Sequence, residues 1–320
     1  MRIGIDLMGS DTAPQILFES IIQAVPLLET SDLLIVFATQ HVIDQVAPAC
    51  FSFKKSIQFH AVTDVIAMGD DPLSSIRHKK NSSIVLGIKL LRKQKIDALV
   101  SAGNTGALVG AATISLSKFP GINRPALLAL LPTQKGFVAV IDVGGNVSCK
   151  AENLIQFAQI GAAYQSCNLE GRTPKVGLLN IGAESKKGTL EVRQAYQALT
   201  EQVDSKMEFV GNIEGREVFE GKVDVLVTNG FTGNVLLKTT EGVASFIFDT
   251  LKDLDSSEEF KQVQRYFNYA EYPGALICGV EGVVIKCHGN ATPKAMLNSI
   301  KGAMHLVRQD FISKIKKELL

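Results

Sequence analysis

The stretch ALLALLPTQKGFVAVIDVGGN, residues 126–146, decides how this chain folds. It holds two apolar runs, 126–131 and 137–142, that are separated only by 132–136. That connection is too short for a crossover helix, so the two runs are expected to pair as an antiparallel hairpin. The second run ends in DVGGN, a glycine- and asparagine-rich turn that directly follows a buried strand.

Outside the hairpin, strand-like and helix-like segments alternate. Nearly continuous apolar runs, as expected of strands buried on both faces, lie at 2–7, 33–38, 57–61, 98–101, 175–180, 208–210, 224–228 and 283–287. Segments with helical periodicity lie at 14–25, 82–93, 104–116, 151–166, 189–201, 233–254 and 293–317. The alternation predicts a three-layer α/β/α fold whose sheet is mostly parallel and, because of the hairpin, mixed. No linker or repeat interrupts the pattern, so we expect a single domain over 1–320.

Composition excludes several classes of protein. The chain is 46% hydrophobic and carries 33 Lys and Arg against 32 Asp and Glu, which argues against disorder and against a general polyanion binder. The five cysteines show no CxxC spacing, so a disulfide framework or a zinc site is not expected and a reducing cytoplasm fits. The start of the sequence is unlike a signal peptide, and the longest uncharged stretch, 98–117, is too polar for a membrane span.

An amphipathic helical insertion is expected around 250–273. Charged residues and glutamines alternate there with Phe260, Val263, Tyr266 and Phe267. An ordinary surface helix explains this pattern, and so does a contact with a second copy or with a membrane surface.

Glycine-rich loops follow many of the expected strands. They read LMGSD (7–11), SAGNTG (101–106), DVGGN (142–146), NIG (180–182), NGFTGN (229–234) and CHGN (287–290). In open α/β sheets ligands bind where the strands end, and glycine lets backbone amides and helix starts approach an anion. The set predicts an anion site with few charged groups, although ordinary strand-to-helix turns use the same residues. There is no GxxxxGK[ST] motif and no GxGxxG after a strand, which disfavours a standard ATPase or Rossmann dehydrogenase.

Eight blocks of the sequence resemble a known family. They are IGIDLMGSDTAP, DPLSSIRHKKNSS, VSAGNTGAL, PGINRPAL, DVGGNVSCKAENLIQFA, VGLLNIGAESKKG, FVGNIEGREVFEG and NGFTGNVLLKTTEG. In this order they are similar to the motifs of PlsX, the bacterial acyl-ACP:phosphate acyltransferase family, from near residue 1 to about residue 300. The resemblance implies a homodimer whose fold is related to phosphotransacetylases and isocitrate dehydrogenases. It also implies transfer of a fatty acyl group from acyl carrier protein to inorganic phosphate, giving acyl-phosphate for phospholipid synthesis.

The chain departs from that family at a few positions. Ala183 stands where the family usually has glutamate, and Asn229 stands where it usually has aspartate. Ser10, Gly145 and Pro273 also differ from the usual motif residues. Any mechanism that requires a carboxylate at 183 or 229 is therefore not available to this chain.

The chemistry expected from the resemblance is direct attack of phosphate on the thioester, without a covalent acyl-enzyme and without a cofactor. The candidate phosphate-binding residues come from the loops: Asn104, Thr105, Gly106, Asn146, Asn180, Thr232, Gly233 and Asn234. The candidate catalytic residues are the cations Lys187, Arg124 and Lys238, together with His288 as proton donor to the leaving thiolate. Each of these four residues is also compatible with a structural or solvated role.

Three further assignments concern partners and metals. Arg77, Lys79 and Lys80 form a local basic cluster that could receive an acidic carrier protein, or could be a solvated charge run. Asp249 and Asp253 stand one helical turn apart without a third ligand, so no metal site is expected. Cys287 and His288 are not expected to form a dyad, because successive strand side chains point to opposite faces.

Two rival functions stay open. One is a short-chain phosphate acetyl- or butyryltransferase that uses coenzyme A. The other is a non-catalytic module that binds acyl carrier protein or an anion. The expected location is the cytoplasm, with a peripheral contact at the inner face of the cell membrane as a further hypothesis.

Overall fold

The computed structural model describes residues 1–169, 171–202, 205–251, 257–268 and 271–319, in two compact units. The first unit comprises residues 1–118 and 270–312, and the second comprises residues 119–269 and 313–320. The sequence marks no boundary between residues 118 and 119, and the single domain expected from it stays a prediction.

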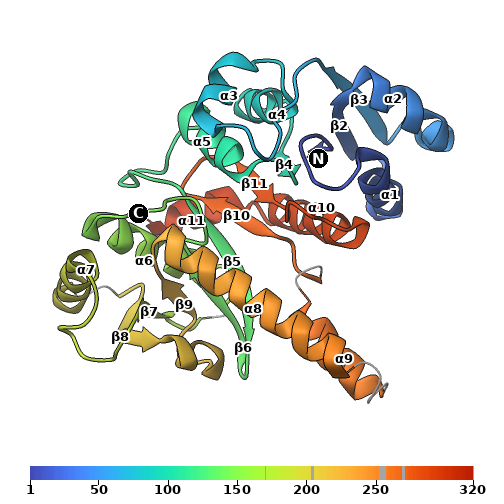
Figure 1. The fold of residues 1–320 in the computed structure, drawn as a ribbon. Helices are drawn as coiled ribbons and strands as arrows, with labels where there is room; N and C mark the ends of the chain where they lie inside the picture. The colour runs from blue at the N-terminus through green and yellow to red at the C-terminus, as the bar shows by residue number, and fades with distance from the viewer. Residues whose placement is uncertain (170, 203–204, 252–256, 269–270, 320) are drawn as a thin grey trace. The chain divides into compact units, whose positions relative to one another are not determined.

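The first unit is built on a sheet with the strand order β3-β2-β1-β4-β11-β10 (Figure 1). Its strands are β1 (Arg2–Asp6), β2 (Leu33–Thr39), β3 (Ile57–Val62), β4 (Ala98–Ser101), β10 (Ala275–Cys278) and β11 (Val283–Lys286). All neighbours run parallel except β10, which is antiparallel to β11. The central strands are buried along their length, which explains why their sequences are apolar runs without alternation.

Helices cover both faces of this sheet. They are α1 (Pro14–Ala24), α2 (Gln40–Val46), α3 (Pro72–His78), α4 (Ser83–Arg92), α5 (Thr105–Ser115) and α10 (Pro293–Arg308). α1 packs against α10, which lies on β1, β4 and β11. α4 packs on β1 and β4, and α5 packs on α3 and α4.

The second unit has the strand order β5-β6-β9-β7-β8. Its strands are β5 (Ala126–Thr133), β6 (Gly136–Ile141), β7 (Lys175–Asn180), β8 (Glu208–Glu214) and β9 (Val225–Val227). β5 and β6 form the expected antiparallel hairpin, and the other neighbours are parallel. The predicted α/β fold with a mixed, mostly parallel sheet is therefore confirmed.

The helices of the second unit are α6 (Ala151–Ser166), α7 (Leu190–Glu201), α8 (Gly230–Leu251) and α9 (Glu258–Phe267). α11 (Phe311–Leu319) belongs mostly to this unit. α6 packs on β6, β9 and β7, and the long helix α8 packs on β5 and β6 (Figure 1). The Tyr266 hydroxyl of α9 donates a hydrogen bond to the Gly136 carbonyl, 2.7 Å away, which anchors this amphipathic helix to the hairpin.

Several elements differ from the sequence-based expectation. The segment 293–317 was expected to be one helix, but Asp310 has a φ of +49° and separates α10 from α11. α2, α3 and β10 are short elements that periodicity did not reveal. Of the amphipathic insertion, residues 252–256 and 269–270 lie outside the described residues. None of the helices that the structure describes combines the length and apolar character needed to cross a membrane.

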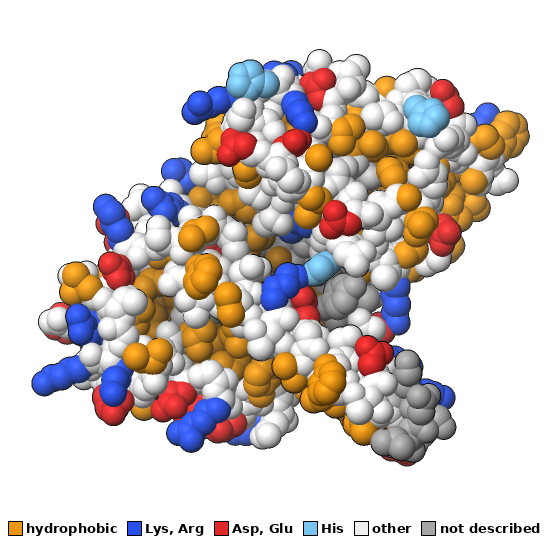
Figure 2. Space-filling model, in the orientation of Figure 1, with side chains coloured by type: hydrophobic (Ala, Val, Ile, Leu, Met, Phe, Trp, Pro, Cys, Tyr) orange, Lys and Arg blue, Asp and Glu red, His pale blue; other side chains and the backbone are white. Residues whose placement is uncertain are grey.

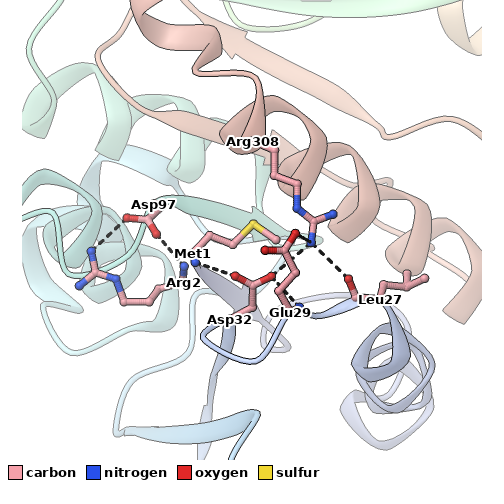
Figure 3. Close-up of polar contacts among 7 residues, drawn as sticks. All are labelled: Met1, Arg2, Leu27, Glu29, Asp32, Asp97 and Arg308. Carbon is pink, nitrogen blue, oxygen red and sulfur yellow. Dashed lines mark hydrogen bonds and ion pairs between the residues drawn. The ribbon is translucent and has the colours of Figure 1, made fainter.

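A cluster of ion pairs lies at the amino ends of the first unit's strands (Figure 3). The Asp32 carboxylate is 4% exposed and accepts from the Met1 ammonium at 2.7 Å and from the Arg308 guanidinium at 3.2 Å. Beside it, Arg2 pairs with Asp97 at 3.0 Å. Although burial opposes it, hydrogen bonding to the Met1 ammonium, to a backbone amide and to Arg308 lowers the pKa of Asp32 below its ordinary value of 3.8.

We predict that Asp32→Asn lowers the free energy of unfolding by about 3 kcal/mol at pH 7, because it leaves the buried Met1 ammonium and the more exposed Arg308 guanidinium without their carboxylate. A lowered pKa stabilises the fold above the unfolded value and loses that effect as the pH falls through the folded value. The difference between wild type and variant in urea denaturation should therefore shrink as the pH drops below 3.8. A difference that is the same at pH 7 and pH 3 would contradict this assignment.

Candidate active site

Three neighbouring strands of the second unit end at one edge of its sheet. β9 lies between β6 and β7, and all three are parallel. The loops that leave their carboxyl ends are 142–150, 181–189 and 228–229, and the last of these leads straight into α8. The structure therefore brings to one edge, within this unit, the loop that contains Asn146, the strand end at Asn180 and the helix start at Thr232.

Asp142 organises the first of these loops. Its carboxylate is fully buried and accepts five hydrogen bonds from the main and side chains around it. Four donors are backbone amides, those of Leu127 (3.0 Å), Gly144 (3.1 Å), Gly145 (2.8 Å) and Asn146 (2.6 Å). Burial raises the pKa of Asp142, and these donors oppose that shift by favouring the charged form. These contacts show that Asp142 caps the loop that follows β6.

The start of α8 is interlocked with this loop. The Gly230 amide donates to the Asn146 carbonyl at 2.7 Å, and the Asn229 side chain caps the helix by accepting from the Thr232 amide at 2.9 Å. A β-carbon on Gly233 would overlap the Asp142 carbonyl oxygen. Asparagine caps a helix as well as aspartate does, so the departure from the family motif at 229 preserves this local structure.

Two candidate cations lie near the Asp142 loop and the start of α8. The Arg124 side chain is exposed, and its Nη1 lies 3.4 Å from the Ser148 carbonyl oxygen in the same loop. Lys238 lies two turns into α8, where its ammonium pairs with Glu241 at 2.9 Å.

Burial raises the pKa of Cys149, in the loop 142–150, to about 11, which leaves this thiol protonated and unsuited to act as a nucleophile at neutral pH.

The loop 181–188 is held by two asparagines. Asn180 donates from Nδ2 to the Lys187 carbonyl at 3.1 Å and accepts from the Ile181 amide at 2.8 Å. Asn212 of β8, which the sequence did not single out, donates to the Glu184 carbonyl at 2.9 Å. The Lys187 side chain itself is exposed, as are those of Ala183 and Glu184.

In the first unit, β1, β4 and β11 are neighbours, and their loops also meet. Asn104 caps α5 by accepting from the Ala107 amide at 3.0 Å, while its Nδ2 donates to the Ala67, Met68 and Asp70 carbonyl oxygens. Thr105 and Gly106 form the first turn of α5. His288 follows β11, half-buried, and its Nδ1 accepts from the Asn290 amide at 3.3 Å. In the neutral ring this contact leaves the proton on Nε2.

Three of the four asparagines expected to bind phosphate thus have side-chain amides that are engaged within the protein. The Nδ2 of Asn146 donates to the Pro125 carbonyl and to Asp142, both at 2.8 Å. Like those of Asn104 and Asn180, the side-chain amide of Asn146 therefore stabilises the loop through hydrogen bonds within the protein. Thr232 and Asn234, in the first turns of α8, have exposed side chains.

The basic cluster of the first unit is only partly exposed to partners. Lys79 is tied down, since its ammonium pairs with Asp70 at 2.5 Å and donates to the Val65 carbonyl at 2.7 Å. Its hydrogen bond lowers the pKa of Asp70. Arg77 and Lys80 are exposed. Among the residues that the structure describes, no group of His, Cys, Asp and Glu could hold a metal ion, and Asp253 lies outside them.

Comparison with solved structures defines the class of fold. The chain is similar to a phosphotransacetylase from Streptococcus pyogenes with a TM-score of 0.64 and 13% identity, covering 96% of this chain and 94% of that one. It is similar to a branched-chain phosphotransacylase from Enterococcus faecalis with a TM-score of 0.62 and 14% identity, covering 96% and 99%. The fold is therefore phosphotransacetylase-like, as the sequence predicted.

Sequence comparison then places the chain in a family. The model of the family described as "Fatty acid synthesis protein" matches residues 1–314. The chain is 40% identical to the phosphate acyltransferase of Chlamydia caviae, over 100% of this chain and 99% of that one. It is 37% identical to that of Thermoanaerobacter pseudethanolicus, over 100% and 97%. The chain belongs to this family, the one predicted from its motifs, and is an acyltransferase.

We predict that Gly233→Ala lowers both stability and activity, because the added methyl group pushes α8 away from the Asp142 carbonyl. The expected loss in free energy of unfolding is about 1–3 kcal/mol. Gly242→Ala is the matched control, since it lies in the same helix and nothing stands within 4 Å of its added β-carbon. That control should stabilise the protein by about 1 kcal/mol. Equal thermal unfolding and turnover in the two variants would contradict the interlock.

Proposed function

We propose that this chain transfers a long-chain fatty acyl group from acyl carrier protein to inorganic phosphate, and that the acyl-phosphate product serves phospholipid synthesis. The observation that carries the proposal is the match over the whole chain, at 40% identity, to a phosphate acyltransferase. The glycine- and asparagine-rich loops at the strand ends support it, because they suit an anionic substrate.

Phosphate is assigned to the start of α8. Thr232 and Asn234 supply exposed side chains there, and Gly233 lets the helix approach the Asp142 loop closely. The partial positive charge of a helix amino end favours an anion. In the first unit, Thr105 and Gly106 begin α5 and offer a second helix start of the same kind. Asn104, Asn146 and Asn180 contribute by holding the loops in place.

The reaction needs no acyl-enzyme. A phosphate oxygen forms a bond to the thioester carbon, the carbon–sulfur bond breaks, and the leaving thiolate takes up a proton. Phosphate is an anionic nucleophile at pH 7, so orientation and charge stabilisation are what the protein must supply. Lys187 and Arg124 are assigned to the negative charge that develops, and Lys238 to a supporting role because Glu241 pairs with it. His288 is assigned as the proton donor to the thiolate, and it donates from its imidazolium form, in which both ring nitrogens carry a proton.

The direct test supplies the pure protein with phosphate and one acyl donor at a time, and follows acyl-phosphate as its hydroxamate. We expect product from palmitoyl-acyl carrier protein and little from acetyl-coenzyme A. Product from acetyl-coenzyme A alone would establish the short-chain transferase instead. Product from neither donor, together with retained binding of the carrier, would establish the non-catalytic module.

Lys187→Ala should lower kcat by about 10- to 100-fold, because one charged contact to the transition state is lost. Lys186→Ala removes an equally exposed charge from the same loop and is expected to change kcat less than about threefold. Steady-state assays at saturating phosphate make the comparison. Equal losses in the two variants would show that the loop's overall charge, not Lys187, matters.

The carrier protein is assigned to the exposed residues Arg77 and Lys80. Acyl carrier proteins are acidic, so complementary charge speeds encounter. We predict that Arg77→Glu with Lys80→Glu raises KM for the acyl carrier substrate by about tenfold at low salt, with the KM for phosphate unchanged. The effect should fade at high salt through screening. An unchanged KM for the acyl carrier substrate in this double variant would exclude this surface as the binding site of the carrier protein.

The homodimer and the peripheral membrane contact are assigned to the apolar side chains exposed on α8 and α9. They are Phe231, Val235, Val243, Phe246, Ile247, Leu251 and Val263. Figure 2 shows apolar side chains open to solvent along the course of α8. So much exposed apolar surface is typical of an interaction site. A protein that sediments as a monomer at micromolar concentration and does not bind anionic vesicles would overturn both assignments. The proposed location of the protein is the cytoplasm.

A further inference from the structure

Three polar side chains lie in a row beneath the loops of the first unit. Asp6 ends β1, Ser101 ends β4 and Lys286 ends β11, and the strand registers pair Ser101 with each of the other two. Residues paired in this way lie at the same level of the sheet. Asp6 and Ser101 are fully buried, and Lys286 is only 7% exposed.

The Asp6 carboxylate holds backbone amides of two loops. It accepts from the Met8 amide at 2.8 Å and from the Ser101 hydroxyl at 2.7 Å. The Ser101 hydroxyl oxygen in turn accepts from the Gly103 amide at 3.1 Å. One carboxylate therefore fixes the loop after β1 directly and the loop after β4 through a serine.

The Lys286 ammonium holds backbone carbonyls of two loops. It donates to the Ala102 carbonyl at 3.4 Å and to the carbonyl of Cys287. Its charge also attracts the Asp6 carboxylate. Burial raises the pKa of Asp6, while Ser83, Ser101 and Lys286 oppose that shift by favouring the charged carboxylate. The Asp6 carboxylate, which accepts from amides, and the Lys286 ammonium, which donates to carbonyl oxygens, thus connect the loops that follow β1, β4 and β11.

Stability alone gives no reason for this arrangement. Burying two charges costs free energy that well-packed apolar residues would not, and such replacements are often neutral or stabilising. The strands on which the pair stands are otherwise lined by apolar residues such as Ile5, Val100 and Ile285. The loops that the pair fixes are the ones that contain Asn104 and His288.

We propose that Asp6 and Lys286 are positioning residues for acyl transfer, which set the loops 101–106 and 287–290 and through them the place of His288. The assignment rests on the proposed function, in which His288 supplies the proton to the leaving thiolate. Because a carbonyl and the amide of the same peptide point in opposite directions, the bond from Lys286 to the Cys287 carbonyl fixes the orientation of the peptide that enters His288. Beyond His288, the Gly289 carbonyl accepts from the Ser10 hydroxyl at 2.8 Å, which ties the same loop to the one after β1.

The test compares Asp6→Asn, Lys286→Met and the double variant with Asp32→Asn. Asp32 is a matched control, because it is a buried, cation-paired carboxylate of the same unit at the opposite, amino end of the strands. Each protein is examined by urea denaturation and by steady-state formation of acyl-phosphate from palmitoyl-acyl carrier protein and phosphate. Turnover is compared only at temperatures where every variant is folded.

We expect both single variants at the Asp6–Lys286 pair to lose stability and to lower kcat by about 10- to 100-fold, with little change in the KM for phosphate. The double variant should regain part of the stability, because neither buried charge then remains without the attraction of the other, while kcat stays low. Asp32→Asn should lose stability and keep the wild-type kcat.

Activity that recovers with stability in the double variant, or single variants whose kcat matches that of Asp32→Asn, would overturn the positioning role. A wild-type protein that forms no acyl-phosphate would overturn the proposed function itself, so the two failures are distinguishable.

Discussion

The Asp142 carboxylate accepts five hydrogen bonds while it is fully buried, and the second unit's candidate site depends on this arrangement. A carboxylate without partners would be costly to bury, so the loop 142–146 must wrap around it to supply donors. That wrapping places the Asn146 carbonyl where the Gly230 amide meets it at 2.7 Å. The amino end of α8 is therefore positioned by the same carboxylate that orders the loop.

The two units use a related solution at their strand ends. Asp6 ends β1 and accepts from the amide two residues later, that of Met8, at 2.8 Å. Asp142 follows β6 and accepts from the amide two residues later, that of Gly144, at 3.1 Å. In each case the aspartate is fully buried and the residues after it form a glycine-containing loop. The acidic residues within these motifs thus build the loops.

Much of the fold could be predicted because it is set by local constraints. The connection 132–136 is too short for a helix, so the hairpin of β5 and β6 follows from chain length alone. The parallel strands follow from apolar runs that alternate with helical segments. The break at Asp310 was missed, because a positive φ at an aspartate has no sequence signature. β10 was missed although its apolar run is as long as that of β4, so the length of a run does not decide which short strands can be predicted.

The candidate site was predictable at the level of loops and less so at the level of side chains. The loops around Asn146, Asn180 and Thr232 do meet at one sheet edge, as parallel strand order requires. The partners of individual amides depend on which carbonyl oxygens tertiary folding brings near, and spacing does not encode that. The side-chain amides of Asn104, Asn146 and Asn180 therefore bond within the protein, which the sequence did not reveal. Asp6 and Lys286 are 280 positions apart, so no local pattern in the sequence marks them as neighbours.

The central claim is that an Asp142-ordered loop presents the start of α8 to inorganic phosphate. Hydrogen–deuterium exchange of the whole protein with and without saturating phosphate tests it directly. The account predicts slower exchange in peptides that cover residues 229–236 and 181–188. Protection that is absent there at saturation, or that appears only in segments remote from these loops, would contradict it.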